Sequence, residues 1–183
     1  MTEMDSINIT LSDIGKSSGL NTALVRYYFG NKRGMLYALA DRAAAPAVEK
    51  LSEIVSADIS ATEKMKRYIV LLTDTYFHHP YLNRLWPHLC KTDDEYAEKI
   101  LNEFLLTVKG FIYSMLDQGV ESGEFKAVNN AFFSYQFMAS CDALFRSTGL
   151  SKRAFDVEGI NDKMKDDYAA HLVDTILGGL AAK

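Results

Sequence analysis

Apolar positions recur at helical spacing along most of the chain, which predicts an all-α protein. The pattern is clearest in residues 95–122, where apolar side chains alternate steps of four and three. One ridge holds Ile100, Phe104, Val108, Phe111 and Met115, and a second ridge beside it holds Leu101, Leu105, Ile112 and Leu116. We expect this helix to be central and packed on several sides.

Capping and breaking residues divide the rest of the first half into helices. A helix is expected from Lys32 toward Pro46, which either breaks it or starts the next turn, and the apolar pattern resumes at once over residues 47–57. Ser60 or Thr62 can cap the following helix, which His79 and Pro80 stop. Residues 80–90 predict a short helix or turn cut by Pro87.

Three further helices follow from similar signals. A capping box at residues 92–95 opens the central helix. Asn129 and Asn130 start a helix that is apolar on nearly every side and that Gly149 ends, and the last helix begins near Asn161. A monomer would cover such a broad apolar arc poorly.

Residues 10–36 predict two short helices joined by a tight turn, then a third. Leu11, Ile14 and Ser18 share a face of the first helix, which Gly19 can end with a positive backbone angle. Asn21 or Thr22 can cap the second helix, Gly30 closes it, and Asn31 can cap the third. The second helix is expected to bury Leu24, Val25 and Tyr28 or Phe29, and to expose Thr22, Ala23, Arg26 and Tyr27.

Positive charge is concentrated in this stretch. Residues 21–34 carry three basic and no acidic side chains, Arg26, Lys32 and Arg33, in a chain of net charge −4. Residues 1–45 have a net charge of +1 (five basic, four acidic), so the remainder carries −5. A local, salt-sensitive affinity for an anion is expected here, and a pI near 5.6 argues against general binding of nucleic acid.

The residues of this stretch resemble a known family. The runs Ile14-Gly15, Ser18-Gly19-Leu20, Ala23-Leu24-Val25-Arg26-Tyr27-Tyr28-Phe29-Gly30-Asn31-Lys32 and Gly34-Met35-Leu36 closely resemble the helix-turn-helix of TetR-family transcriptional regulators. Residues 119–125, Gly-Val-Glu-Ser-Gly-Glu-Phe, also resemble that family. The resemblance implies an all-α fold with an N-terminal helix-turn-helix DNA-binding domain, residues 1–45, and a larger effector-binding and dimerisation domain, residues 46–183.

The same resemblance implies the partners and the DNA-contacting residues. Partners would be operator DNA, a small-molecule effector and a second copy of the chain, paired through the last two helices as a four-helix bundle. Bases would be read by the start of the second helix and phosphates held around it, a set formed by Thr10, Ser12, Asn21, Thr22, Ala23, Leu24, Arg26, Tyr27, Tyr28 and Lys32. Tyr28 and Leu24 could equally be core residues.

One departure concerns the start of the chain. The family has an amphipathic helix before the helix-turn-helix, whereas nine residues precede Thr10. Residues 1–4 could be the last turn of that helix. We therefore expect either that residue 1 lies within this helix or that the helix is missing from the core of the DNA-binding domain.

Other chemistry finds little support. Cys90 and Cys141 lie far apart, and there is no phosphate-binding glycine loop, nucleophile elbow or HExxH motif, so no enzyme, cofactor or metal site is expected. His78, His79 and His88 could be imagined as metal ligands, but a helix end with partly exposed imidazoles is the simpler interpretation. With neither a membrane-spanning run nor a signal peptide, a cytoplasmic protein is expected.

An effector pocket between the middle helices follows from the resemblance. Its candidate lining residues are aromatic or apolar, each of which could instead be plain core: Tyr76, Trp86, Phe104, Phe111, Met115, Tyr135, Phe137 and Cys141. Polar anchors could be Tyr76, Tyr135, His88 or Arg84. The leading hypothesis is a homodimeric repressor released by an apolar or aromatic effector, and the alternatives are a ligand-binding or interaction dimer that no longer binds DNA and a small helical enzyme.

Overall fold

The computed structural model describes residues 10–19, 21–146, 153–157 and 159–182, and the predicted all-α fold is confirmed. The amphipathic helix expected before Thr10, Leu20 and the stop at Gly149 lie outside the described residues. The named elements are α1 (Leu11–Ser18), α2 (Thr22–Phe29), α3 (Lys32–Ser56), α4 (Ala61–His78), α5 (Leu82–Leu89), α6 (Glu95–Lys99), the π-helix η1 (Ile100–Leu105), α7 (Leu106–Glu121), α8 (Asn130–Arg146) and α10 (Asp162–Leu180). In the described part of the chain, no helix is both long and apolar enough to cross a membrane.

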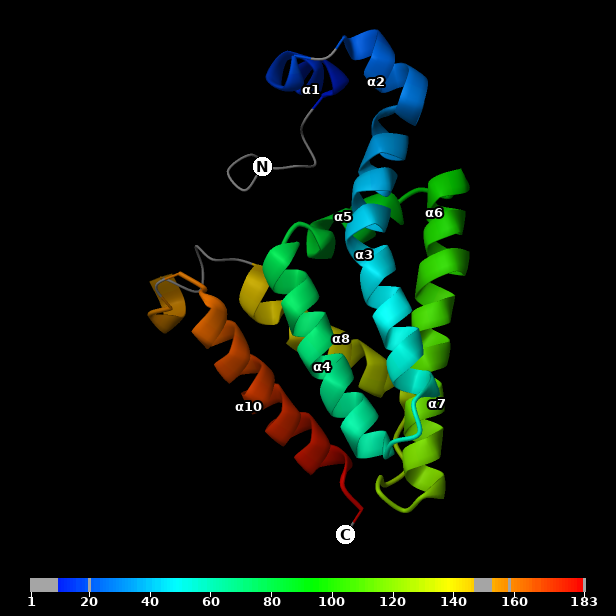
Figure 1. Ribbon diagram of the computed structural model, residues 1–183, viewed down its shortest axis with the longest axis vertical. Helices are drawn as coiled ribbons and strands as arrows, with labels where there is room; N and C mark the ends of the chain where they lie inside the picture. The colour runs from blue at the N-terminus through cyan, green and yellow to red at the C-terminus, as the bar shows by residue number, and fades with distance from the viewer. Residues whose placement is uncertain (1–9, 20, 147–152, 158, 183) are drawn as a thin grey trace.

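The molecule is elongated, with α1 and α2 at one end and α3 leading from them into the helical body (Figure 1). Pro46 lies inside α3 without ending it, so the helix is continuous from Lys32 to Ser56. The expected boundary between residues 45 and 46 therefore falls within a helix. A proline removes one backbone donor, and the surrounding turns of this long helix tolerate that loss.

The central helix of the prediction is interrupted. Asp94, not Thr92, caps its first turn by accepting from the backbone N–H groups of Tyr96 and Ala97 at 3.1 Å each. Five residues of α-helix are followed by the π-helix η1 and then by α7. A π-turn adds one residue to the helical repeat and shifts the face that follows it. Leu101 and Leu105 consequently stay exposed, at 42% and 36%, whereas Ile112 and Leu116 of the same predicted ridge are buried.

The body is organised around α4, which contacts α3, α7, α8 and α10. Its buried face includes Met65, Ile69 and Leu72, and Ser60 caps it as expected. Lys64 is buried within this packing, and its Nζ donates to the Val55 carbonyl at 2.7 Å and to Gln118 Oε1 at 2.9 Å. The ammonium therefore ties α4 to α3 and to α7.

The segment between α7 and α8 shows why a glycine-rich motif occurs there. A Cβ on Gly119 would lie 2.0 Å from the Phe125 ring, and Gly123 has a φ of +77°. The Glu124 carboxylate accepts from the backbone N–H groups of Ala61 and Thr62, at 3.1 and 2.9 Å. This segment thus adds a second cap to α4, from a position more than sixty residues away.

Candidate nucleic-acid interface and effector cavity

The second helix presents an aromatic and cationic face to solvent. Tyr27 is 82% exposed, Tyr28 74% and Leu24 48%, and Arg26 is also exposed. Only Val25 of the expected buried stripe is buried, because α2 is covered on that one side by its neighbours. The interpretation of Tyr28 and Leu24 as core residues is therefore wrong, and Phe29 is likewise exposed at 39%.

Caps define where this face begins and ends. Gly19 ends α1 with a φ of +68°, and Asn21 Oδ1 then accepts from the Ala23 N–H at 2.8 Å to start α2. Gly30, at a φ of +70°, ends α2, and Asn31 Oδ1 accepts from the Gly34 N–H at 2.9 Å. The two ends of α2 are therefore set by local hydrogen bonds that the sequence encodes.

The remaining predicted DNA contacts lie around the same end. Thr10 caps α1 through reciprocal hydrogen bonds with Asp13, and its hydroxyl lowers the pKa of that carboxyl. Ser12, Asn21 and Ala23 are exposed, whereas Thr22 and Lys32 are half-buried. Thr10 and Asn21 are thus structural caps as well as candidate contacts.

Arg33 has a different role from the one that its neighbours suggested. Its Nη2 donates to Asp94 Oδ1 at 3.0 Å and to the Leu89 carbonyl at 2.6 Å, so the guanidinium is committed to the body of the protein. The pairing lowers the pKa of Asp94. The anion expected beside this cation is therefore a carboxylate of the same chain, 61 residues further along.

A second set of contacts joins α3 to the α6–η1 segment. The Tyr37 hydroxyl donates to Glu103 Oε2 at 2.9 Å, and burial together with this carboxylate raises the pKa of Tyr37 to about 12. A Cβ on Gly34 would lie 2.6 Å from the Tyr96 hydroxyl oxygen, so Gly34 permits a close approach of α3 to α6. The first turns of α3 therefore contact the body of the protein through Arg33, Gly34 and Tyr37.

A small apolar cavity lies between α3, α4, α5 and η1. Its volume is about 30 Å³, enough for roughly one water molecule and too small for an effector without rearrangement. Its walls are lined by Ala44, Ala47, Val48, Leu51, Tyr68, Leu71, Leu72, Thr75, Tyr76, Leu82, Trp86, Phe104, Val108 and Met138.

Three of the eight expected pocket residues, Tyr76, Trp86 and Phe104, line this inner cavity. Met115, Phe137 and Cys141 are buried in the core beside it, Phe111 is half-buried, and none of these four lines it. Tyr135 is 81% exposed on α8 and lies outside it. Helical periodicity marked these positions as apolar or aromatic, but it could not decide which side of each helix meets the cavity.

The sequence did not predict some of the residues that line the inner cavity. Tyr68 and Met138 meet across it, with the Tyr68 hydroxyl 3.8 Å from the Met138 sulfur. Val48 and Leu51 reach it from the half of α3 that follows Pro46. Their apolar spacing was visible, but nothing in it indicated a cavity.

An outer cavity of about 200 Å³ adjoins the inner one and shares Val48, Trp86 and Phe104 with it. Its other walls are Tyr37, Asp41, Ala45, Glu49, Lys99, Ile100 and Glu103. The suggested anchors His88 and Arg84 line neither of these two cavities.

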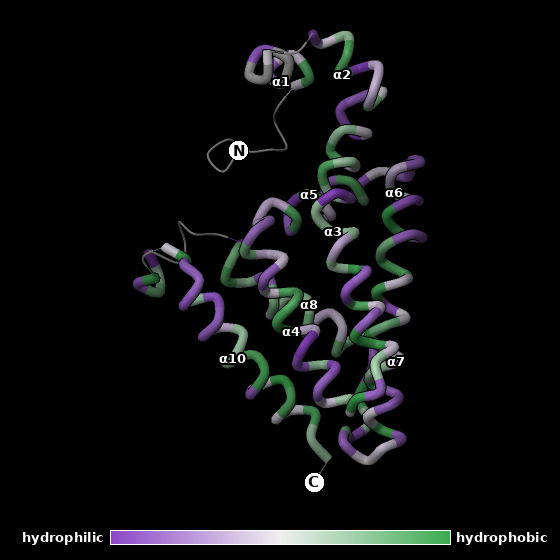
Figure 2. The backbone as a smooth tube through the Cα atoms, viewed as in Figure 1, coloured by the Kyte–Doolittle hydropathy of each residue, from purple (hydrophilic) through white to green (hydrophobic). Residues whose placement is uncertain are grey.

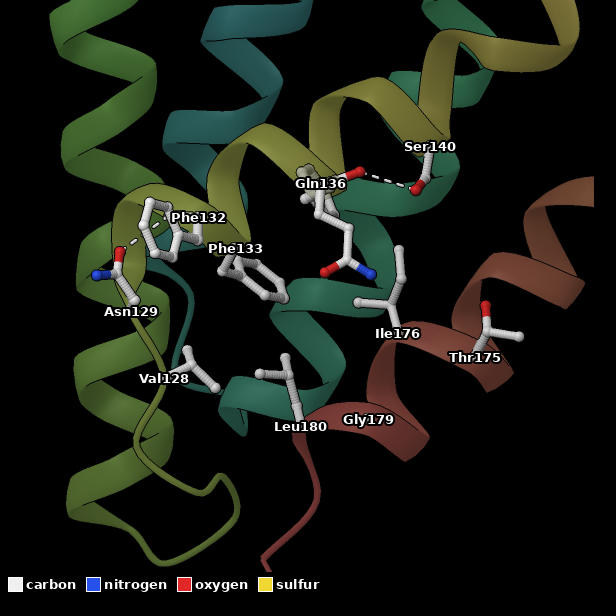
Figure 3. A pocket seen from close by; sticks show the side chains of 11 residues that line it. Val128, Asn129, Phe132, Phe133, Gln136, Ser140, Thr175, Ile176, Gly179 and Leu180 are labelled. Atoms are coloured by element: carbon white, nitrogen blue, oxygen red, sulfur yellow. Dashed lines mark hydrogen bonds between the residues drawn. The ribbon is translucent and has the colours of Figure 1, made fainter.

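A third hollow, of about 390 Å³, lies between α8 and α10 (Figure 3). Phe132, Phe133 and Gln136 face it from α8, and Ile176 and Leu180 face it from α10. Phe132 is 75% exposed, and the second half of α10 is more apolar than its first half (Figure 2). The two helices therefore offer a broad apolar surface beside an open groove.

His78 and His79 each have a local hydrogen-bond partner. His78 Nδ1 lies 3.0 Å from the Asp74 carbonyl oxygen, and His79 Nδ1 lies 3.2 Å from the Tyr81 hydroxyl. Across the described residues, no group of three potential ligands could hold a metal ion.

Known proteins agree with this architecture. A family described as "Tetracyclin repressor-like, C-terminal domain" matches residues 58–183. The search of curated proteins gave no match.

Several solved structures with the same fold are described as transcriptional regulators. The ketosteroid transcriptional regulator KstR2 of Mycobacterium tuberculosis has a TM-score of 0.76 at 14% identity, covering 99% of this chain and 89% of that one. A TetR/AcrR-family regulator from Thermobifida fusca has a TM-score of 0.72 at 18% identity, covering 97% and 90%. FadR of Bacillus subtilis, solved with stearoyl-CoA, has a TM-score of 0.67 at 18% identity, covering 94% and 87%. The family match spans more than half of the chain, and the chain belongs to the TetR family of transcriptional regulators.

Proposed function

We propose that this regulator binds a specific operator as a homodimer and is released from it by a small effector. The observation that carries this proposal is the exposed face of α2, where Arg26, Tyr27 and Tyr28 project from a helix held in place by caps. Residues 21–34 contain no carboxylate that would repel phosphate.

Each side chain of this face suits a particular contact. Arg26 can fork onto a guanine in the major groove, and Thr22 can hydrogen-bond a base edge. Ala23 and Leu24 suit a thymine methyl group. Thr10, Ser12, Tyr27, Tyr28 and Lys32 would hold the phosphate backbone, and Asn21 is a further candidate contact at the start of α2.

Dimerisation through α8 and α10 would supply the second reading helix. The open groove between these helices and the exposed Phe132 and Tyr135 are apolar features that a four-helix bundle would bury. The two recognition helices would then read half-sites about one helical turn, roughly 34 Å, apart.

Effector control requires two states with different spacings of the reading helices. An effector that enlarges the cavity beside Trp86 and Phe104 would act on η1, whose Glu103 holds Tyr37 of α3. Because linkage is reciprocal, operator DNA would weaken effector binding by the same factor. This arrangement supports a repressor that is released by its ligand.

A mobility-shift assay tests the proposal. The full chain is mixed with DNA from upstream of its own gene, at two salt concentrations and with unrelated competitor DNA. A shift that resists competitor and weakens steeply with salt is expected. A shift abolished equally by any DNA would favour a ligand-binding dimer that retains the fold without operator recognition.

A further inference from the structure

A stacked aromatic pair lies at the boundary between the inner and outer cavities, together with Val48. The rings of Trp86 and Phe104 are stacked, with centroids 4.5 Å apart and an interplanar angle of 22°. Both residues line both cavities. Movement of either ring would therefore widen the connection between the 200 Å³ outer cavity and the smaller apolar inner cavity.

The two spaces differ in chemistry. The inner cavity is lined almost entirely by aliphatic and aromatic side chains. The outer cavity carries the carboxylates of Asp41, Glu49 and Glu103 against one ammonium, that of Lys99, a net charge of −2. The Lys99 Nζ is also drawn toward the aromatic rings of Tyr37 and Tyr96, at 5.7 and 5.9 Å from their centroids.

We propose that the outer cavity is the entrance of the effector site, that Trp86 and Phe104 form its gate, and that it selects an amphiphile with a cationic head. The apolar body displaces the gate and enlarges the inner cavity, while the head remains beside Asp41, Glu49 and Glu103. This inference deepens the proposed function, since it rests on effector control of the same site.

The rim opposes an anionic ligand. A carboxylate or phosphate head in the outer cavity would face three carboxylates and one ammonium, a net charge of −2, in a space of about 200 Å³. FadR of Bacillus subtilis was solved with stearoyl-CoA, which carries several negative charges. The outer cavity of this chain predicts the opposite preference.

The gate is placed where it can reach the reading helices. Phe104 belongs to the π-helix η1, a rare helical form that occurs frequently at functional sites. The preceding residue, Glu103, accepts from the Tyr37 hydroxyl of α3. Displacing Phe104 thus acts on a contact with the helix that leads to the DNA-binding end.

Trp86 is the only tryptophan of the chain, so its fluorescence reports on the gate directly. The full-length protein, without DNA, is titrated with three probes of equal chain length, decyltrimethylammonium, decanol and decyl sulfate. The two ionic probes are kept below their micelle concentrations and decanol below its solubility. We expect a saturable change of Trp86 emission, with half-saturation at least about 5-fold lower for the cation than for the sulfate.

Charge variants test the head-group preference. The double variant Glu49→Gln/Glu103→Gln should weaken binding of decyltrimethylammonium about 4- to 25-fold, because two exposed charges each contribute about 2- to 5-fold. The affinity for decanol should stay unchanged. The matched control is Glu98→Gln, which removes a carboxylate from the same helical segment without lining either cavity. A gate variant, Phe104→Leu, should shift the ligand-free emission of Trp86 by removing its stacking partner.

The outcomes are distinct. No saturable change with any probe, equal or tighter binding of the sulfate, or an unchanged cation affinity in the double variant would overturn the proposal. Loss of far-UV circular dichroism at saturation would also overturn it, because the emission change would then report denaturation. Since no DNA is present, any of these results would leave operator binding to be decided by the mobility shift alone.

Discussion

The guanidinium of Arg33, in the first turn of α3, contacts the carboxylate of Asp94, the N-cap of α6, at 2.5 Å between Nε and Oδ2. The same guanidinium donates to the Leu89 carbonyl at the end of α5. One side chain therefore joins the helix that leaves the reading end to two helices of the body.

Replacing Arg33 should weaken this junction. Arg33→Ala removes hydrogen bonds to a carboxylate and to a backbone carbonyl at a side chain that is 24% exposed, so the free energy of unfolding should fall by about 1 kcal/mol. Urea unfolding measures this change in the free energy of unfolding. Arg67→Ala is the control, because Arg67 pairs with Glu63 on an exposed helix surface and should cost less than about 0.5 kcal/mol. Equal effects of the two changes would show that the junction contributes no more than a surface pair.

Arg26 should carry base discrimination. Arg26→Ala is expected to cost about 1–3 kcal/mol on the operator and to relax the preference at one base pair per half-site. Lys32→Ala should instead weaken all sequences alike and reduce the dependence of affinity on salt. Fluorescence anisotropy with single-base operator variants separates the two. A uniform loss on every DNA from Arg26→Ala would contradict its base-reading role.

The α8–α10 surface should control assembly. Phe132 is 75% exposed beside the open groove, so Phe132→Ser should raise the dimer dissociation constant about 30-fold or more if it is an interface anchor. Analytical ultracentrifugation measures this constant. Leu106→Ser, at a residue 46% exposed on α7, is the control and should leave the dimer intact. A Phe132→Ser variant that sediments as the wild type would place the interface elsewhere.

The contribution of Glu124 to the free energy of unfolding should depend on pH. Hydrogen bonds from Thr62, with further ones from Ser122 and Ala61, lower the pKa of Glu124 from 4.5 to about 2. Because the folded pKa is lower than the unfolded value, the stabilisation is present above pH 4.5 and is lost as the pH falls toward 2.

Glu124→Gln should therefore destabilise the protein by about 1 kcal/mol at pH 7, as for loss of a helix cap, and the difference should shrink below about pH 4.5. Chemical unfolding at a series of pH values gives the comparison with Glu121→Gln, an exposed carboxylate of α7. A difference that is constant with pH would mean that the carboxylate charge is not responsible.

Local signals in the sequence located most helix ends. Asn21, Asn31, Ser60 and Asn161 each accept a hydrogen bond from the first turn of the helix that they were expected to start. Prolines were less informative, since Pro46 and Pro87 both lie inside helices. A proline inside a helix costs about 3 kcal/mol through the missing donor and a steric clash, which tertiary packing can offset, and packing is not visible in a local pattern.

The sequence by itself determined the helical class, the caps of α2 and the exposure of Arg26 and Tyr27, because each depends on residues within a few positions of one another. Only the tertiary structure decided that Arg33 pairs with Asp94, that η1 turns Leu101 and Leu105 to solvent, and that Tyr76, Trp86 and Phe104 share a cavity while Tyr135 does not. These relationships join residues far apart in the chain. Helical periodicity states which side chains are apolar, and the packing of helices against one another selects which of them meet.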